Sequence, residues 1–148
     1  MKFVIQRVTE ASCHIDGSEY SSIGKGFMVL VGISNEDTKE IADKFIAKMS
    51  KMRIFEDEAG KTNLALKDVD GEVMMISQFT LYADCKKGNR PGFSMAGVPD
   101  MAKELYEYIC EKTKELIPSV KTGVFGADMK IHLVNDGPFT IILDDAIL

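Results

Sequence analysis

Three polar side chains that could take part in chemistry interrupt an apolar run in the middle of the chain. Ser77, Gln78 and Thr80 lie within residues 72–90, which read EVMMISQFTLYADCKKGNR. A hydroxyl group in such a run becomes a nucleophile only when a base lies beside it. Two interpretations stay open at this point. The run is either a buried strand that delivers polar groups to a site, or an edge strand with one solvated face followed by a solvated loop.

Basic residues follow the same run. Lys86, Lys87 and Arg90 form the densest basic patch of a chain whose formal net charge is -5. That charge argues against a protein whose whole surface binds nucleic acid, but it leaves room for a small, salt-sensitive contact. A solvated loop is the other interpretation of the patch. Cys85 beside the lysines is either an activated thiol or an incidental loop cysteine.

Several common catalytic sites are excluded by the residues that the chain lacks. His14 and His132, the two histidines, lie in separate strand patterns with no ligand at metal-binding spacing, and neither H-E-x-x-H nor G-x-S-x-G occurs. The cysteines, Cys13, Cys85 and Cys110, are odd in number and lack C-x-x-C spacing, so they indicate neither a disulfide framework nor a zinc site. We therefore expect no metal and no cofactor, and three free thiols.

The composition predicts one domain over residues 1–148. The chain has 148 residues, of which 45% are hydrophobic and 28% are charged, as in a compact globular domain. No apolar run approaches the ~20 residues of a membrane span, and the N-terminal sequence lacks the pattern of a signal peptide. We expect a soluble, intracellular protein without a membrane partner.

Hydrophobic periodicity predicts the elements that would position these residues. Strands are expected at 2–8, 11–15, 20–23, 27–33 and 63–66, from residue 72 onward, and at 120–125, 129–134 and 139–143, and helices at 38–52 and 99–116. The first strands predict an antiparallel meander. In 129–134, Met129, Ile131 and Leu133 should face inward, and Lys130 and His132 outward. The fold class is α+β, with mostly antiparallel sheets and two covering helices.

Two long motifs carry a resemblance to a known family. S-Q-F-T-L-Y-A-D at 77–84 and N-D-G-P-F-T at 135–140 resemble the motif pair of the D-aminoacyl-tRNA deacylases of the bacterial and eukaryotic type. Further segments match in the same order, namely Q-R-V at 6–8, G-K-G at 24–26, R-I-F-E-D at 53–57 and G-V-F-G-A-D-M at 123–129. The chain departs from the family pattern at Phe139, where valine is more frequent, and at Asn89, where a basic residue is common.

The resemblance implies a hydrolase that cleaves the ester between a D-amino acid, or glycine, and the 3′ end of tRNA. It implies a cytoplasmic homodimer with a barrel-like core, no cofactor and no DNA partner. The implied catalytic residues are Ser77, Gln78, Phe79 and Thr80. By the same resemblance Gly137 and Pro138, joined by a cis bond, select the chirality from the neighbouring subunit. Arg7 and Met129 join them at the substrate, and Lys86, Lys87 and Arg90 contact the tRNA.

The chemistry of such a site is consistent with the side chains that are present. A backbone carbonyl against the α-carbon excludes an L side chain, tolerates D side chains and cannot reject glycine. Gly137 suits that approach because it has no Cβ. Backbone N–H groups at Phe79 and Thr80 would stabilise the oxyanion, and the 2′-hydroxyl of the tRNA would assist proton transfer. Thr80 as a nucleophile, and an RNA-binding dimer without catalysis, are the alternatives.

Overall fold

A long first strand, β1 (Lys2–Ile15), organises the sheet in the computed structural model, which describes residues 1–148. The other strands of this sheet are β2 (Ser18–Ile23), β3 (Gly26–Gly32), β6 (Glu72–Ser77), β7 (Val120–Thr122) and β8 (Lys130–Asp144). A separate hairpin consists of β4 (Phe55–Glu56) and β5 (Thr62–Leu64). The helices are α1 (Lys39–Lys51) and α2 (Pro99–Leu116), and the 3-10 turns are η1 (Leu66–Val69) and η2 (Phe79–Tyr82). The predicted α+β class is confirmed.

The strand order is β2-β1-β3-β6-β7, with β8 on the other side of β1. Strand β1 pairs antiparallel with β2, β3 and β8, whereas β3 and β6, and β6 and β7, are parallel. The predicted meander is wrong, because β3 pairs with β1 and not with β2. Strand β1 has 14 residues and β2 only 6, so the first half of β1 keeps a free edge, which β3 occupies.

The sheet curls into a nearly closed barrel. The Ser21 hydroxyl of β2 donates to the backbone carbonyl of Thr122 on β7 at 2.8 Å, which joins the two ends of the strand order. Ile131 and Leu133 of β8 pack against the small core inside the curl, and His132 is exposed, as the alternation predicted. The core residues are Val8, Ala11, Cys13, Ile23, Met28, Met74 and Ile76. The barrel-like core is therefore confirmed.

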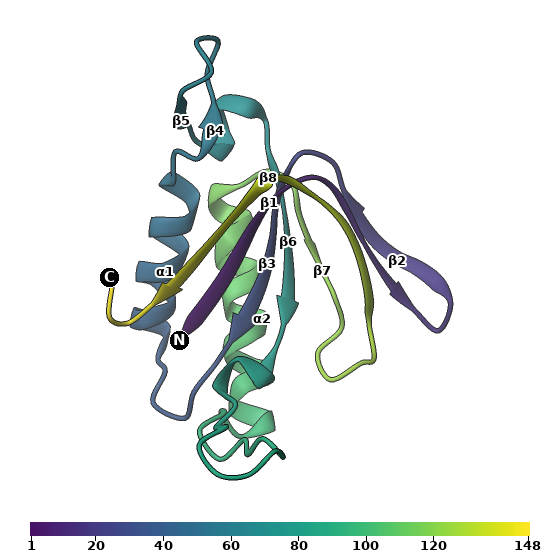
Figure 1. The fold of residues 1–148 in the computed structure, drawn as a ribbon, viewed down its shortest axis with the longest axis vertical. Coiled ribbons are helices and arrows are strands. Elements are labelled where there is room, and N and C mark those ends of the chain that lie inside the picture. Colours follow the sequence, from purple (N-terminus) through teal and green to yellow (C-terminus); the bar gives the residue numbers. More distant parts are fainter.

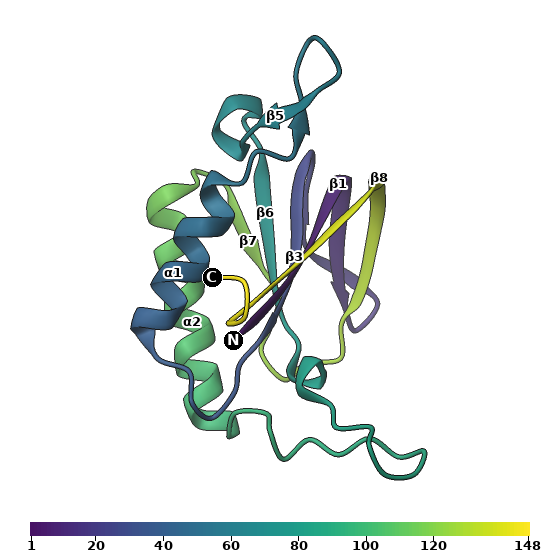
Figure 2. The same cartoon turned by 60° about the vertical axis from the view of Figure 1, so that its left-hand side comes forward.

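Both helices cover the same side of the sheet, as Figures 1 and 2 show. Helix α1 begins after Thr38, whose hydroxyl accepts the N–H of Ile41 at 3.3 Å, and α2 begins with Pro99. Their inner faces complete a larger core of 23 buried residues. The β4–β5 hairpin and the loop that follows η2 project from opposite ends of the molecule (Figure 2). Neither helix is long and apolar enough to cross a membrane.

Two of the predicted strand boundaries are wrong, because strands that were expected to be separate are continuous. Residues 130–134 and 139–143 belong to β8, with Met129 just before it, and residues 2–8 and 11–15 belong to β1. Strand β8 keeps its direction through N-D-G-P because pairing with β1 resumes at Thr140, opposite Gln6. The glycine and proline therefore mark a bulge within a strand. Strand β7 ends at Thr122, shorter than expected.

A buried ion pair joins the start of β1 to the turn before α1. The amino group of Met1 donates to Asp37 Oδ1 at 2.6 Å, and the two side chains are 0% and 2% exposed. The second oxygen of Asp37 accepts the N–H of Ser34 at 2.7 Å. Asp145, whose side chain is 65% exposed, makes a longer contact of 3.1 Å with the same amino group. Asp37 therefore ties together two segments that border the apolar core.

We predict that Asp37→Asn lowers the free energy of unfolding by about 3 kcal/mol, because it leaves a buried amino group without its charged partner. Asp145→Asn is the matched control and should cost less than about 1 kcal/mol, since that carboxylate is exposed. Urea denaturation followed by circular dichroism measures both values. Equal effects of the two substitutions would contradict the assignment of the buried pair to Asp37.

Candidate functional site

Strand β6 carries the polar residues to the end of the sheet. Val73 and Met75 face the helix-side core, while Met74 and Ile76 face the barrel core, so the strand is buried on both faces. Such burial is typical of a parallel strand between two neighbours. The interpretation as an edge strand is therefore wrong, since β6 lies between β3 and β7. Ser77 is its last residue, and the chain then turns into η2.

A cavity of about 290 Å³ opens where β6 ends. Ser77, Gln78 and Phe79 line one side of it, and Met129 lines the other, so four of the predicted site residues meet there. The remaining lining residues are Ile76, Phe125, Gly126, Ala127, Asp128 and Ile131. Thr80 does not line the cavity. Its hydroxyl instead accepts a hydrogen bond from the side-chain amide of Gln78 at 2.6 Å.

The backbone of η2 offers hydrogen-bond donors beside this cavity. Phe79 and Thr80 are the first residues of a 3-10 turn, and the first N–H groups of such a turn have no acceptor within it. Gln78 precedes the turn and makes no side-chain capping bond. The next N–H groups along the chain are occupied, since Leu81 donates to the carbonyl of Gln78 at 3.3 Å. Two adjacent donors are thus free to bind an oxyanion.

A second, more apolar cavity shares the same wall. It measures about 550 Å³, and Ser77, Gln78 and Phe79 separate it from the first cavity together with Phe125 and Gly126. The rings of Phe79 and Phe93 meet edge to face at its border, with centroids 5.1 Å apart. Sequence reasoning assigned no role to Phe93 or Phe125. The sequence feature that could have drawn attention to Phe125 is the motif G-V-F-G at 123–126, in which an aromatic residue lies between two glycines.

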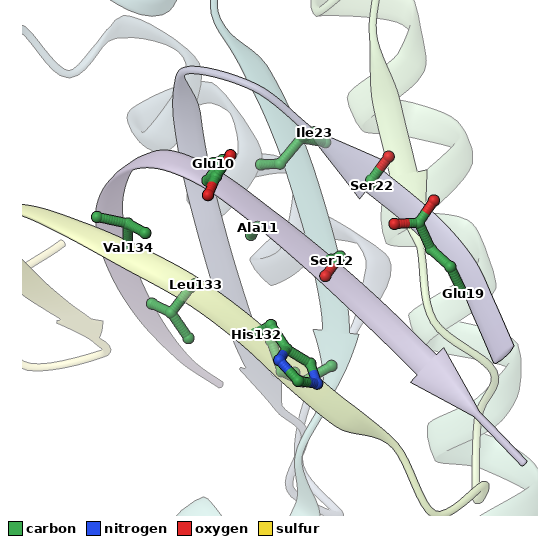
Figure 3. Close-up of a pocket in the computed structure, with 10 residues that line it drawn as sticks. Glu10, Ala11, Ser12, Glu19, Ser22, Ile23, His132, Leu133 and Val134 are labelled. Carbon is green, nitrogen blue, oxygen red and sulfur yellow. The ribbon is translucent and has the colours of Figure 1, made fainter. Parts of the chain in front are cut away.

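The smaller cavity contains no general base of the usual kind. Its one carboxylate, Asp128, is exposed and accepts a hydrogen bond from Lys130 at 2.7 Å. The two histidines lie elsewhere, with ring centroids 4.6 Å apart across β1 and β8. His132 borders a separate, larger concavity of about 730 Å³, whose lining residues come from β1, β2 and β8 (Figure 3). The smaller cavity is therefore lined by one carboxylate and no histidine.

The N-D-G-P segment forms a bulge on β8. Thr140 of β8 pairs with Gln6 of β1, and Asn135 pairs with Val8. Residues 136–139 of β8 therefore lie opposite a single residue of β1, Arg7. The Gly137–Pro138 bond is cis, as the resemblance implied, and both residues are exposed. Neither residue lines the two cavities that Ser77, Gln78 and Phe79 share. Within one chain, the structure does not bring the predicted selector to the predicted catalytic residues.

Arg7 holds this bulge in place. Its side chain is buried, Nε donates to the carbonyl of Asp136 at 3.0 Å, and Nη1 donates to the carbonyl of Ile54 at 2.6 Å. The guanidinium carbon lies 4.7 Å from the centre of the Phe139 ring, a cation–π geometry. A Cβ at Gly137 would come within 3.1 Å of Arg7 Nη2 and of the Phe139 nitrogen. Arg7 thus contacts the bulge through the Asp136 carbonyl, and no hydrogen bond joins it to the carbonyls of Gly137 or Pro138.

The predicted basic residues lie on the loop that follows η2. Lys86, Lys87 and Arg90 are exposed, and a bridge between Asp84 and Gly92 closes the loop at its base. Phe93, the next residue after this bridge, borders the apolar cavity. The basic residues are therefore close in sequence to a residue that lines that cavity, and Cys85 lies exposed beside them.

Comparisons with known proteins cover nearly the whole chain. The family described as D-Tyr-tRNA(Tyr) deacylase matches residues 4–144. A D-aminoacyl-tRNA deacylase from Lactobacillus acidophilus is 56% identical over 144 residues, which are 97% of this chain and 99% of that protein.

Two solved structures have the same fold. The first, described as c-Myc DNA Unwinding Element Binding Protein, has a TM-score of 0.93 and 40% sequence identity, and the match covers 98% of this chain and 99% of that one. The second, described as a probable eukaryotic D-amino acid tRNA deacylase, has a TM-score of 0.86 and 15% identity over 96% of this chain and 97% of that one. At that identity it supports the fold alone.

Proposed function

The chain belongs to the D-aminoacyl-tRNA deacylase family of hydrolases, and from this premise we propose that it hydrolyses the ester between a D-amino acid and the 3′-terminal adenosine of tRNA. Free tRNA and the free D-amino acid are the products. The observation that carries the proposal is the near full-length match, which includes both motifs of the site. Because charged tRNA is used by the ribosome, we propose that the enzyme works in the cytoplasm.

The carbonyl of the scissile ester sits, in this proposal, against the first N–H groups of η2. Water attacks the carbonyl carbon, and the N–H groups of Phe79 and Thr80 stabilise the negative charge on the tetrahedral oxygen. The bond between that carbon and the 3′-oxygen then breaks. The 2′-hydroxyl of the tRNA assists, since it lies next to the leaving oxygen and the cavity offers no histidine. A proton moves from the attacking water to the 3′-oxygen, which completes the hydrolysis.

The Thr80 side chain orients the site rather than attacks. Its oxygen already accepts a hydrogen bond from Gln78 at 2.6 Å, and no base is hydrogen-bonded to it that could remove its proton. The terminal adenosine fits the apolar cavity of about 550 Å³, where Phe79 and Phe93 offer aromatic faces for the base.

Chirality is judged by Gly137 and Pro138 of a second subunit. Three features support this arrangement. The bulge is exposed, it is held rigidly by Arg7, and it lies outside the cavities of its own chain. Its free carbonyls, placed against the α-carbon, would accept hydrogen bonds from the ammonium group and leave no room for an L side chain. Glycine has no side chain to exclude, so glycyl-tRNA is also a substrate.

A homodimer follows from this arrangement. Val134 and Ile142 flank the bulge on β8, and they are exposed by 48% and 55%, as large apolar side chains in an unfilled interface would be. In a symmetric dimer the same face serves both subunits, so each bulge enters the cavity of the other chain. Each dimer then contains two complete sites.

A second candidate function is an RNA-binding dimer without catalysis. Such a module requires a basic surface with aromatic stacking platforms. The exposed Lys86, Lys87 and Arg90 beside Phe93 would serve as a minimal surface of this kind. The net charge of -5 disfavours it, and a hydrolytic assay separates the two functions.

The test of the proposed function is release of the amino acid from charged tRNA. The purified protein should release D-tyrosine and glycine, and should leave L-tyrosyl-tRNA intact. Deacylation of L-tyrosyl-tRNA at the same rate would contradict chiral selection by Gly137 and Pro138. Binding of tRNA without release of any amino acid would favour the RNA-binding module.

We predict that Thr80→Ala lowers the single-turnover rate by about tenfold, because the substitution loosens the Gln78 contact and keeps the backbone N–H groups. Thr80→Ser, which keeps the hydroxyl, is the matched control and should stay close to the wild-type rate. Rapid-quench measurement on D-tyrosyl-tRNA gives both rates. A fall of Thr80→Ala to the uncatalysed rate would restore Thr80 as a nucleophile.

Mixed dimers test whether Gly137 acts across subunits. Gly137→Ala places a methyl group against Arg7 and Phe139, and Phe79→Pro removes one of the two proposed oxyanion donors at a position where a turn accepts proline. Each variant alone should be nearly inactive. A dimer with one subunit of each kind should recover about half of the wild-type rate, since one of its two sites combines intact parts. No recovery would place the selector in the same chain as the donor.

Charge reversal tests the basic loop. The triple variant Lys86→Glu, Lys87→Glu and Arg90→Glu should raise the KM for D-tyrosyl-tRNA about tenfold at low salt and flatten its dependence on salt, with kcat unchanged. The matched control is Lys44→Glu with Lys48→Glu on the exposed face of α1. An unchanged KM in the triple variant would show that these basic residues do not contact the tRNA.

A further inference from the structure

Leu81 contacts two strands from within η2, the turn that also carries Phe79 and Thr80. Its side chain packs on Gly32 of β3, and its carbonyl accepts a hydrogen bond from Lys2 of β1 at 3.2 Å. Its N–H donates to Gln78 at 3.3 Å, which closes the turn on itself. One residue therefore connects the turn to β3 through packing and to β1 through a charged hydrogen bond.

The contact with Gly32 leaves no room for a side chain at that position. A Cβ on Gly32 would lie 2.9 Å from Leu81 Cβ, 3.2 Å from Leu81 Cδ1 and 3.4 Å from the Gln78 carbonyl oxygen. Backbone conformation does not require glycine there, since Gly32 is not among the glycines with positive φ. The absent side chain instead lets the turn lie directly on β3, and any larger residue would push the turn outward by a few tenths of an ångström.

Lys2 holds the other side of the turn. Its ammonium group donates to the Leu81 carbonyl and also lies 4.8 Å from the centre of the Tyr82 ring. Burial, and after it the Asp37 carboxylate, raises the pKa of Tyr82 to about 12, so the phenol stays protonated at neutral pH. The face of the neutral Tyr82 ring therefore lies against the Lys2 ammonium group.

We propose that Gly32, Leu81 and Lys2 are positioning residues that set the depth of η2, and hence the place of the two oxyanion donors relative to the ester carbonyl. This inference rests on the proposed function. Stabilisation of an oxyanion requires donors about 3 Å from the oxygen of the tetrahedral intermediate. A shift of the turn therefore lowers the rate of the chemical step more than it weakens the binding of the tRNA.

The first test is Gly32→Ala, measured with D-tyrosyl-tRNA. We expect kcat to fall about tenfold or more, with KM changed by less than about twofold. The matched control is Gly24→Ala, in which the added methyl group lies 3.3 Å from the Glu72 carboxylate in the same sheet and far from η2 along the chain. The control should lower the Tm of thermal unfolding without changing kcat, because its strain does not reach the turn.

The second test is Lys2→Met, which keeps the apolar stem and removes the ammonium group. It should lower kcat by about threefold at unchanged KM. If Gly32→Ala does not fold, this variant alone tests whether the position of η2 sets kcat. Folded Gly32→Ala with the wild-type kcat, or a change in KM alone, would overturn the proposal and leave the proposed function intact. A wild-type protein that released no D-tyrosine would contradict both.

Discussion

The buried guanidinium of Arg7 is the interaction on which the rest of the structure depends. It lies in the middle of β1, and it satisfies the carbonyl of Asp136 in the β8 bulge and the carbonyl of Ile54 before the β4–β5 hairpin. Two buried carbonyls without a donor would each cost about 1 to 3 kcal/mol. Because the charge is spread over a planar fork, one side chain can hold both segments at fixed angles. Arg7 therefore anchors the bulge, although Gly137 and Pro138 are exposed.

The proposed site is divided into two parts that do not share a cavity within one chain. The donors at Phe79 and Thr80 lie where β6 ends, and the bulge at Gly137 lies outside the cavities beside them. In the proposed mechanism, activity would depend on assembly, since neither part alone would select or hydrolyse a substrate. Backbone groups would provide both the charge stabilisation and the exclusion of the L isomer, in a cavity whose one carboxylate is Asp128.

Backbone groups must be placed accurately, because they cannot rotate to meet the substrate as side chains do. The structure contains two devices for this purpose, and each uses a glycine. At Gly32 the missing side chain lets η2 rest on β3, and at Gly137 it leaves space for Arg7 and Phe139. Each contact joins segments that are far apart in the sequence. Substitution at either glycine would thus change the site through displacement of the backbone.

The sequence by itself determined the local features of this protein. The apolar run before Ser77, the capping threonine of α1 and the inward side chains of β8 follow from periodicity and capping, which act over a few residues. The motif pair predicted the family correctly. Ser77, Gln78 and Phe79 of its first motif line one cavity with Met129, which belongs to the separate segment G-V-F-G-A-D-M. The tertiary structure decided which segments pair. Strand β3 joined β1 because β2 was too short, and the N-D-G-P segment became a bulge because β8 continued along β1. Phe125 and Phe93 join Phe79 at the apolar cavity, and Leu81 contacts Gly32, through packing between segments that are distant in the sequence. No local pattern shows such contacts, because they depend on the competition between distant segments for the same surface.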